Sequence, residues 1–160
     1  MDKIKDCYLK LMDEIDVKSK SNETSKEEEF FNIFSSILEE NGDTSSINYS
    51  PYISKNLNND VKSKKIRVDG YSYEVDNDIT HNTITLIISD FNHDNELSTF
   101  NTNQLEQEFK LAEQFIQICS EGMHFINSID ESSSGFDIAY TLSSTFSRLN
   151  QINIFLITNT

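Results

Sequence analysis

The sequence predicts an α/β (α+β) fold in which helices flank a mixed β-sheet. Four segments repeat apolar residues every three or four positions, as one face of a buried helix does. Three segments are rich in β-branched residues, as strands are. Their order along the 160 residues is helix, helix, strand, strand, helix, helix, strand. We expect a single domain, with a helical N-terminal segment over residues 1–42 and a sheet-containing core over residues 43–160.

The first two helices are predicted from their apolar stripes and their end signals. The first covers residues 3–16, with apolar positions Ile4, Tyr8, Leu11 and Ile15, and polar residues 17–24 end it. The second covers residues 26–40. Ser25 and Glu28 have the spacing of a capping box before it, and Gly42 stands where helices commonly end.

The two middle strands are predicted to form an antiparallel hairpin. Residues 66–75 have a strand pattern, and residues 83–91 are apolar on both faces at their centre, as in a central strand. A turn at residues 76–78 joins them. Residues 43–65, before the hairpin, predict irregular structure with a short helical turn at 53–57.

The C-terminal part predicts two more helices and a last strand. The clearest apolar stripe predicts a long helix over residues 102–127, followed by a helix over 136–148 and a strand over 151–158. We expect that strand to rejoin the sheet beside the central strand. An apolar strand so near the terminus also leads us to expect that the chain is the N-terminal part of a longer protein.

The charge of the chain bounds its partners. The net charge is −14, and residues 68–160 carry 14 acidic residues against two basic ones, Lys110 and Arg148. Nucleic-acid binders usually present a basic face, so this charge disfavours a nucleic-acid partner. The basic cluster Lys62, Lys64, Lys65 and Arg67 is interpreted as a solvated loop. The apolar runs are far shorter than the ~20 residues of a membrane-spanning helix, so no membrane partner is expected.

Two cysteines are present, and they lie far apart in the sequence. Cys7 and Cys119 each fall on an apolar helical face, which predicts buried, reduced thiols. Reduced thiols favour a cytoplasmic location.

Two carboxylates stand out as candidate metal ligands. In the predicted hairpin Asp69 faces a position within a residue or two of Asp90. Acids on neighbouring strands are able to hold Mg²⁺ or Mn²⁺ through oxygen ligands, with Glu28 or Glu29 as a third. Such a metal activates water for attack on a phosphodiester. The alternative is that both acids only end strands at the surface, and the spacing alone favours it.

Three segments carry a resemblance to a known family. They read Glu-Glu-Glu-Phe-Phe-Asn-Ile-Phe (27–34), Val-Asp-Gly-Tyr-Ser-Tyr-Glu (68–74) and Thr-Leu-Ile-Ile-Ser-Asp-Phe (85–91). Over residues 25–158 the chain resembles the N-terminal domain of AIPR-type abortive-infection phage-resistance proteins. In that family an Asp-Gly-Tyr strand precedes a Leu-x-Leu-x-x-x-Asp-Phe strand. The resemblance implies a restriction-endonuclease-like core of the PD-(D/E)XK type, with the order α-β-β-β-α-β.

The resemblance assigns roles to particular residues. Asp69 matches the first motif aspartate, Asp90 matches the second carboxylate, and Glu28 or Glu29 matches the acid that the first helix contributes. The family's lysine should follow the second carboxylate by two positions, where this chain has Asn92. Lys110, on the long helix, is the residue able to replace it. A lysine there stabilises developing charge, so its absence argues for weak or lost catalysis.

Two functions in a bacterial phage-defence protein follow from these assignments. The first is metal-dependent phosphodiester hydrolysis, with Asp69, Asp90 and Lys110 as catalytic residues and Asp69, Asp90 and Glu28 binding Mg²⁺ or Mn²⁺. The second is a catalytically inactive interaction or sensor module, whose partner is another domain of the full-length protein or another protein. An unrelated structural module is a third reading, and the oligomeric state stays open.

Overall fold

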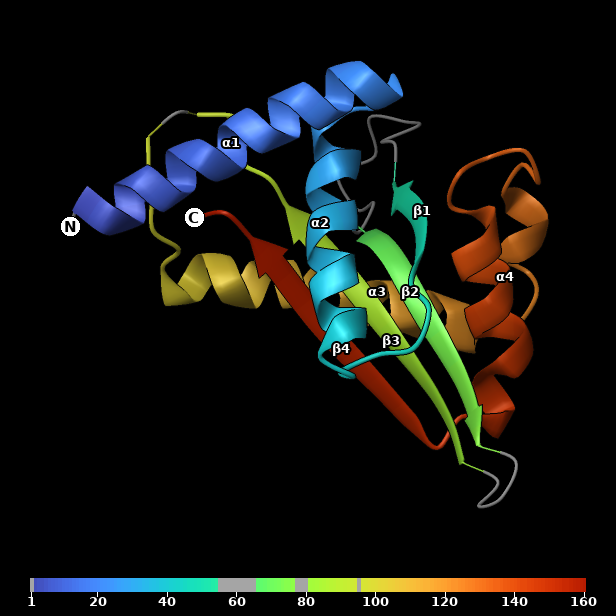
Figure 1. Cartoon of the computed structure of the whole chain (residues 1–160). Helices are drawn as coiled ribbons and strands as arrows, with labels where there is room; N and C mark the ends of the chain where they lie inside the picture. The colour runs from blue at the N-terminus through green and yellow to red at the C-terminus, as the bar shows by residue number, and fades with distance from the viewer. Residues whose placement is uncertain (1, 55–65, 77–80, 95) are drawn as a thin grey trace, which may run out of the picture.

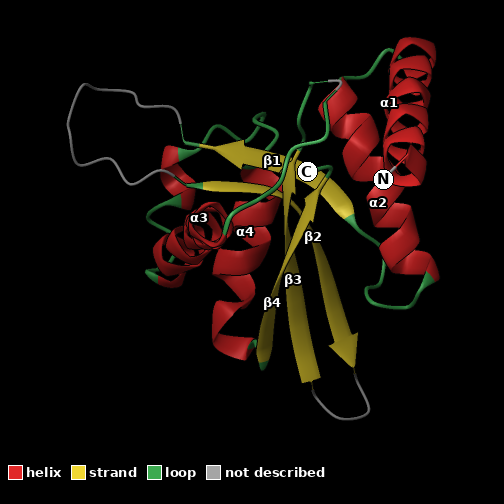
Figure 2. Cartoon of the chain, turned by 90° about the vertical axis from the view of Figure 1, so that its left-hand side faces the viewer, coloured by secondary structure: helices red, strands yellow, loops and turns green. Residues whose placement is uncertain are grey.

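Four strands form one mixed sheet that lies between two layers of helices (Figures 1 and 2). The computed structural model describes residues 2–54, 66–76, 81–94 and 96–160. The elements in chain order are α1 (Asp2–Asn22), α2 (Lys26–Glu40), β1 (Asn48–Ile53), β2 (Arg67–Asp76), β3 (His81–Asp90), α3 (Thr102–Ser120), α4 (Phe136–Thr145) and β4 (Gln151–Thr158). Short 3₁₀ turns occupy Ile126–Ser128 and Phe146–Arg148.

The sheet order is β1-β2-β3-β4. β1, β2 and β3 are antiparallel neighbours, and β4 runs parallel to β3. The predicted hairpin and the predicted return of the last strand beside a central strand are therefore confirmed. The chain is α+β, with a four-stranded mixed sheet and four α-helices among the described residues.

Each face of the sheet buries its own apolar cluster. On one face α1 and α2 pack through Ile15, Phe30 and Phe31 against Ile87 and Ile157. On the other face α3 and α4 cover a larger cluster, and Figure 2 shows these two helices across the sheet from α1 and α2. The buried members of this larger cluster are Ile66, Val68, Ile84, Leu86, Phe115, Cys119, Ile126, Ile138, Ala139 and Leu142. The apolar centre of β3 serves both clusters, which explains why its sequence does not alternate.

The end signals of α2 are confirmed in part, since Ser25 caps the helix and Gly42 ends it, while of the predicted capping box the structure gives the Ser25 side-chain bond. The Ser25 side chain accepts a hydrogen bond from the Glu28 backbone N–H at 3.1 Å, so α2 begins where expected. At the other end Gly42 has φ +75°, and the N–H groups of Gly42 and Asp43 bond to the carbonyls of Glu39 and Leu38. This is a Schellman ending, which requires a left-handed residue.

Four predictions on local structure are corrected by the structure. α1 continues to Asn22, because the pairs Lys18–Glu14 and Lys20–Asp16 support the polar turns that were expected to end it. α3 ends at Ser120 because Gly122, with φ +99°, cannot continue a helix at low cost. Residues 48–53 form β1 rather than irregular structure. Cys7 is exposed, whereas Cys119 is buried as expected.

Other expectations fall partly or wholly outside the described residues. The turn at 76–78, most of the helical turn at 53–57, and Lys62, Lys64 and Lys65 of the basic cluster belong there. Among the described residues, no helix combines the length and the apolar character needed to cross a membrane.

Candidate functional site

The site begins where β2 and β3 separate. Their last paired residues are Gly70 and Ile87, so Asp69 lies just beyond the end of the ladder. There, side chains of β2 supply hydrogen bonds to the backbone of β3. Asp69 Oδ2 accepts the Ser89 N–H at 2.8 Å, and Arg67 Nη2 donates to the Ser89 carbonyl. Buried backbone polar groups need such partners, so Asp69 and Arg67 complete the end of the sheet.

Arg67 also lies between the two predicted metal ligands. Its Nε donates to Asp69 Oδ2 at 3.1 Å, and its Nη1 lies 4.0 Å from Asp90 Oδ1. Asp69 is 5 % exposed, and burial raises its pKa, although Arg67 and the Ser89 N–H act in the opposite direction. The structure therefore brings Asp69 and Asp90 to one place, with a guanidinium between them.

A third carboxylate joins this place from α3. Burial raises the pKa of Glu108; Arg67 lowers it, and Asp90 and Asp69 raise it further. Among the described residues, Glu108 Oε2 is buried without a hydrogen-bond partner. We call Asp69, Asp90 and Glu108 the carboxylate cluster, with Arg67 as its central cation.

The other predicted site residues lie elsewhere. Lys110 is exposed on α3. It follows Glu108 by two positions, or roughly 200° around the helix, so it faces away from the carboxylate cluster. Glu28 is partly buried in the first turn of α2. Burial raises the pKa of Tyr49, and Asp69 and Glu28 raise it further. Glu29 is buried and accepts hydrogen bonds from Thr24 at 2.6 Å and Asn22 at 3.0 Å, so it ties α2 to the end of α1.

Asn92, at the position of the family's lysine, holds the chain after β3. Its N–H donates to Asn159 Oδ1 at 2.7 Å and its side-chain amide donates to Ser98 Oγ at 3.2 Å. Its Oδ1 accepts the N–H of Asp94 at 2.9 Å. These bonds join the loop to the end of β4 and give Asn92 a structural role.

The arrangement does not fit a divalent ion as it stands. Mg²⁺ needs oxygen ligands at about 2.0–2.1 Å in octahedral geometry. Within the described part of the chain, no group of three or more His, Cys, Asp or Glu side chains is placed to hold a metal. Between Asp69 and Asp90 the positive charge comes from Arg67. The metal roles of Asp69, Asp90 and Glu28, and the catalytic role of Lys110, stay predictions.

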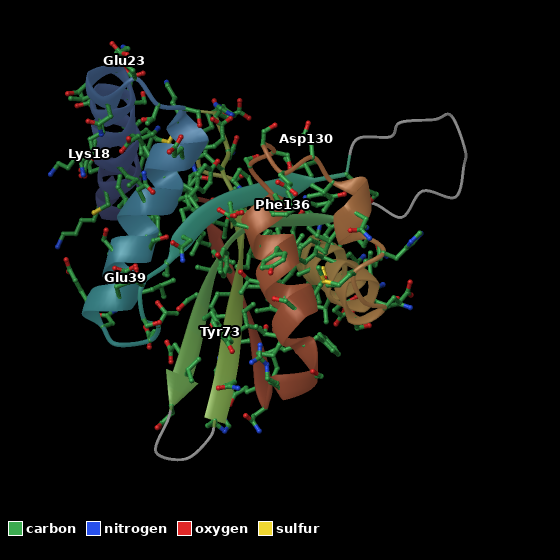
Figure 3. The ribbon with its side chains drawn as sticks, turned by 90° about the vertical axis from the view of Figure 1, so that its right-hand side faces the viewer. Lys18, Glu23, Glu39, Tyr73, Asp130 and Phe136 are labelled. Atoms are coloured by element: carbon green, nitrogen blue, oxygen red, sulfur yellow. The ribbon has the colours of Figure 1, made fainter. Side chains whose placement is uncertain are left out.

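A cavity of about 940 Å³ opens beside the cluster, and we call it the β1 cavity. Its wall is formed by the start of α2, by β1, by Arg67, Asp69 and Ser89, and by the loop from Ser128 to Gly135. Figure 3 shows Asp130 in that loop, at the rim of the molecule. Asp90 and Glu108 line a separate hollow of about 450 Å³, whereas Arg67 lines the β1 cavity.

Two residues of the candidate site escaped the sequence prediction. Arg67 was grouped with the lysines before it, yet it starts β2 and shares a strand face with Asp69, two positions away. This two-residue spacing on a strand is the sequence signal that could have linked Arg67 to Asp69. Glu108 is one of three acidic residues on α3, and no spacing links it to Asp69, because its position depends on how α3 crosses the sheet.

Comparison with known proteins agrees with the sequence motifs. No curated protein and no solved structure matches the chain. The family model described as "Abortive infection phage resistance protein N-terminal domain" matches residues 30–160. The match contains the carboxylate cluster and Arg67, and it leaves out α1 and Glu28. With most of its length matched, the chain belongs to the family of abortive infection phage resistance protein N-terminal domains.

Proposed function

We propose that this phage-resistance domain has a restriction-endonuclease-like core and works as a catalytically inactive interaction module. The order α2, β1, β2, β3, α3, α4, β4 supports such a core, since it follows the order α-β-β-β-α-β that the resemblance implies, with α4 as an additional helix before β4. The antiparallel β1-β2-β3 meander and the parallel β4 are consistent with it. A nuclease-like fold does not by itself establish nuclease chemistry.

The observation that carries the proposal is the engagement of Asp69 and Arg67. Asp69 is bound to the Ser89 N–H and to Arg67, and Arg67 is bound to the Ser89 carbonyl. A metal that used Asp69 and Asp90 together would have to displace the guanidinium between them. Displacement would leave the Arg67 charge, which is 27 % exposed, without its partner, and that is unfavourable.

The surface charge supports a protein partner over a nucleic acid. Residues 68–160 contain Lys110 and Arg148 as their basic residues against 14 acidic ones. Neutralisation of phosphates supplies most of the affinity for nucleic acids, and this half of the chain offers little of it. The partner is another domain of the full-length protein or a separate protein.

One observation favours metal-dependent phosphodiester hydrolysis as a second candidate. Glu108 Oε2 is buried without a partner among the described residues, close enough to Asp90 and Asp69 for both to raise its pKa. If Arg67 moved aside, three carboxylates from β2, β3 and α3 would be available as oxygen ligands for Mg²⁺ or Mn²⁺.

Calorimetric titration with Mn²⁺ and Mg²⁺ distinguishes the two functions. We expect no saturable binding to the wild-type chain at millimolar metal, because Arg67 already neutralises Asp69. An assay with Mn²⁺ should likewise show no cleavage of single- or double-stranded DNA.

The matched variants are Asp90→Asn and Glu108→Gln, whose partly exposed side chains should allow folding. Saturable binding to the wild type that both variants abolish would contradict the proposal and support the hydrolytic candidate. Asp137→Asn, in the first turn of α4, controls for the loss of one negative charge.

A further inference from the structure

One residue that lines the β1 cavity has a buried side-chain hydroxyl without a partner among the described residues. Ser89 lines this cavity, is 5 % exposed, and its Oγ is buried with no hydrogen-bond partner among the described residues. A buried polar atom without a partner carries a free-energy cost. The cost is recovered when a ligand supplies the missing hydrogen bond.

The charged side chains that line the cavity are mostly acidic. Glu27, Asp69 and Asp130 are its acidic members, and Arg67 is the cation among the described lining residues. The N–H groups of Arg67 are already directed at Asp69, at the Ser89 carbonyl and toward Asp90. Carboxylates only accept hydrogen bonds when ionised, so the cavity favours a group that only donates them.

The two acids at the rim are held in their ionised form. Burial raises the pKa of Glu27, but the backbone N–H of Glu27 and the nearby His93 lower it by more, so the pKa is lowered overall. His93 Nε2 lies 2.8 Å from Glu27 Oε1. Bonds from the Ser132 N–H and hydroxyl to Asp130 Oδ1 lower the pKa of Asp130. Both carboxylates are therefore negative at neutral pH, and both line the cavity, one from the start of α2 and the other from the Ser128–Gly135 loop.

The size and walls of the cavity suit a long side chain. Its 940 Å³ lies at the upper end of the range for ligand pockets, about 300–1,000 Å³. Pro51, Ile53 and Ile129 add apolar wall that suits the aliphatic stem of a long side chain. We propose that the β1 cavity receives an arginine or lysine side chain from a basic segment of a partner protein. This assignment rests on the proposed function as an interaction module.

The test is an NMR titration of the isotope-labelled chain with the blocked tripeptide acetyl-Gly-Arg-Gly-amide. We expect saturable shifts of backbone amides at Ser89 and in residues 128–135. The same tripeptide with citrulline keeps the size of the side chain and removes its charge, and it should bind about tenfold more weakly.

Variants locate the binding in the cavity. Glu27→Gln combined with Asp130→Asn should weaken binding of the arginine peptide about tenfold. Glu113→Gln combined with Asp137→Asn removes the same charge outside the cavity and should leave binding unchanged. Ser89→Ala should keep the stability of the fold, because its hydroxyl has no partner to lose, yet weaken binding about three- to tenfold.

Several results would overturn the inference. They are equal binding of the citrulline peptide, equal binding of acetyl-Gly-Glu-Gly-amide, and full binding by the Glu27/Asp130 double variant. If the arginine peptide does not bind and Mn²⁺ does not bind either, this inference fails and the proposed function stands. If Mn²⁺ binds through Asp90 and Glu108, the proposed function fails, whatever the peptide result.

Discussion

Asp69 supplies a hydrogen bond that a neighbouring strand would otherwise provide. It accepts the Ser89 N–H at the point where β2 leaves β3, and Arg67 binds both Asp69 and the Ser89 carbonyl. Asp90 makes a weaker contact with Arg67, since its Oδ1 lies 4.0 Å from Arg67 Nη1, and its side chain is 29 % exposed. The two motif aspartates therefore differ in what they contribute to the fold.

Replacing these two acids should separate their roles. We expect Asp69→Ala to lower the free energy of unfolding by about 2–4 kcal/mol, because it leaves the Arg67 charge and the Ser89 N–H without their carboxylate partner. Asp90→Ala should cost less than about 1 kcal/mol, as for other exposed pairs. Urea denaturation of both variants measures the difference. Two equally small losses would show that Asp69 has no structural role.

At the scale of the element, strong periodic signals were enough to place α2, the hairpin and β4. They failed where a polar or proline-containing segment took its structure from a neighbour. β1 contains Pro51, and its register with β2 shifts between Tyr49 and Tyr52. A proline has no N–H to give, so it is tolerated at such an irregularity of an edge strand. Nothing in the local pattern of residues 48–53 requires a strand until β2 lies beside it.

The candidate site also contains residues that the sequence could place and residues that it could not. Asp69 and Asp90 were placed near each other because a hairpin converts sequence spacing into distance. Glu108 and the Ser128–Gly135 loop reach the site through the packing of α3 and α4, which depends on side chains across the sheet. The sequence alone does not fix such a crossing.

Gly70 joins two elements through its lack of a side chain. A Cβ at this position would meet the ring of Phe31 on α2 and would lie 2.7 Å from the carbonyl oxygen of Asn48 on β1. We expect Gly70→Ala to destabilise the fold by about 1–3 kcal/mol through overpacking. Phe31→Ala alone should cost about 3–5 kcal/mol.

A double-mutant cycle tests this contact. Removing the Phe31 ring relieves part of the clash, so the double variant should lose at least about 0.5 kcal/mol less than the sum of the single losses. Thermal or urea unfolding measures the coupling. Additive losses would mean that α2 moves freely over β2, and the close approach would then not restrict the fold.

Over the whole molecule, acidic charge acts against compactness. The net charge of −14 falls on 160 residues, and the described ion pairs engage few of the acids. Like charges repel more in the folded state than in the expanded one, and salt screens that repulsion over a Debye length of about 8 Å at 0.15 M.

Salt should therefore stabilise this protein. We expect the urea midpoint to rise as NaCl increases from 10 mM to 0.5 M, with most of the gain complete by about 0.15 M. Sodium chloride and potassium chloride should act alike, since screening depends on ionic strength. A midpoint that falls with salt would show that attractive pairs outweigh the repulsion among the acids.

The parallel pairing of β3 with β4 has a consequence for synthesis of the chain. The partners of this ladder, from Thr83 with Gln151 to Asp90 with Thr158, are separated by 68 residues that include α3 and α4. At about 5–20 residues per second, a ribosome needs several seconds to make that stretch. During this time β3 has emerged with one edge unpaired, and an open, apolar edge readily joins another strand. The nascent chain is thus most exposed to misassembly before β4 is translated, and a chaperone that shields β3 in that interval would protect the whole fold.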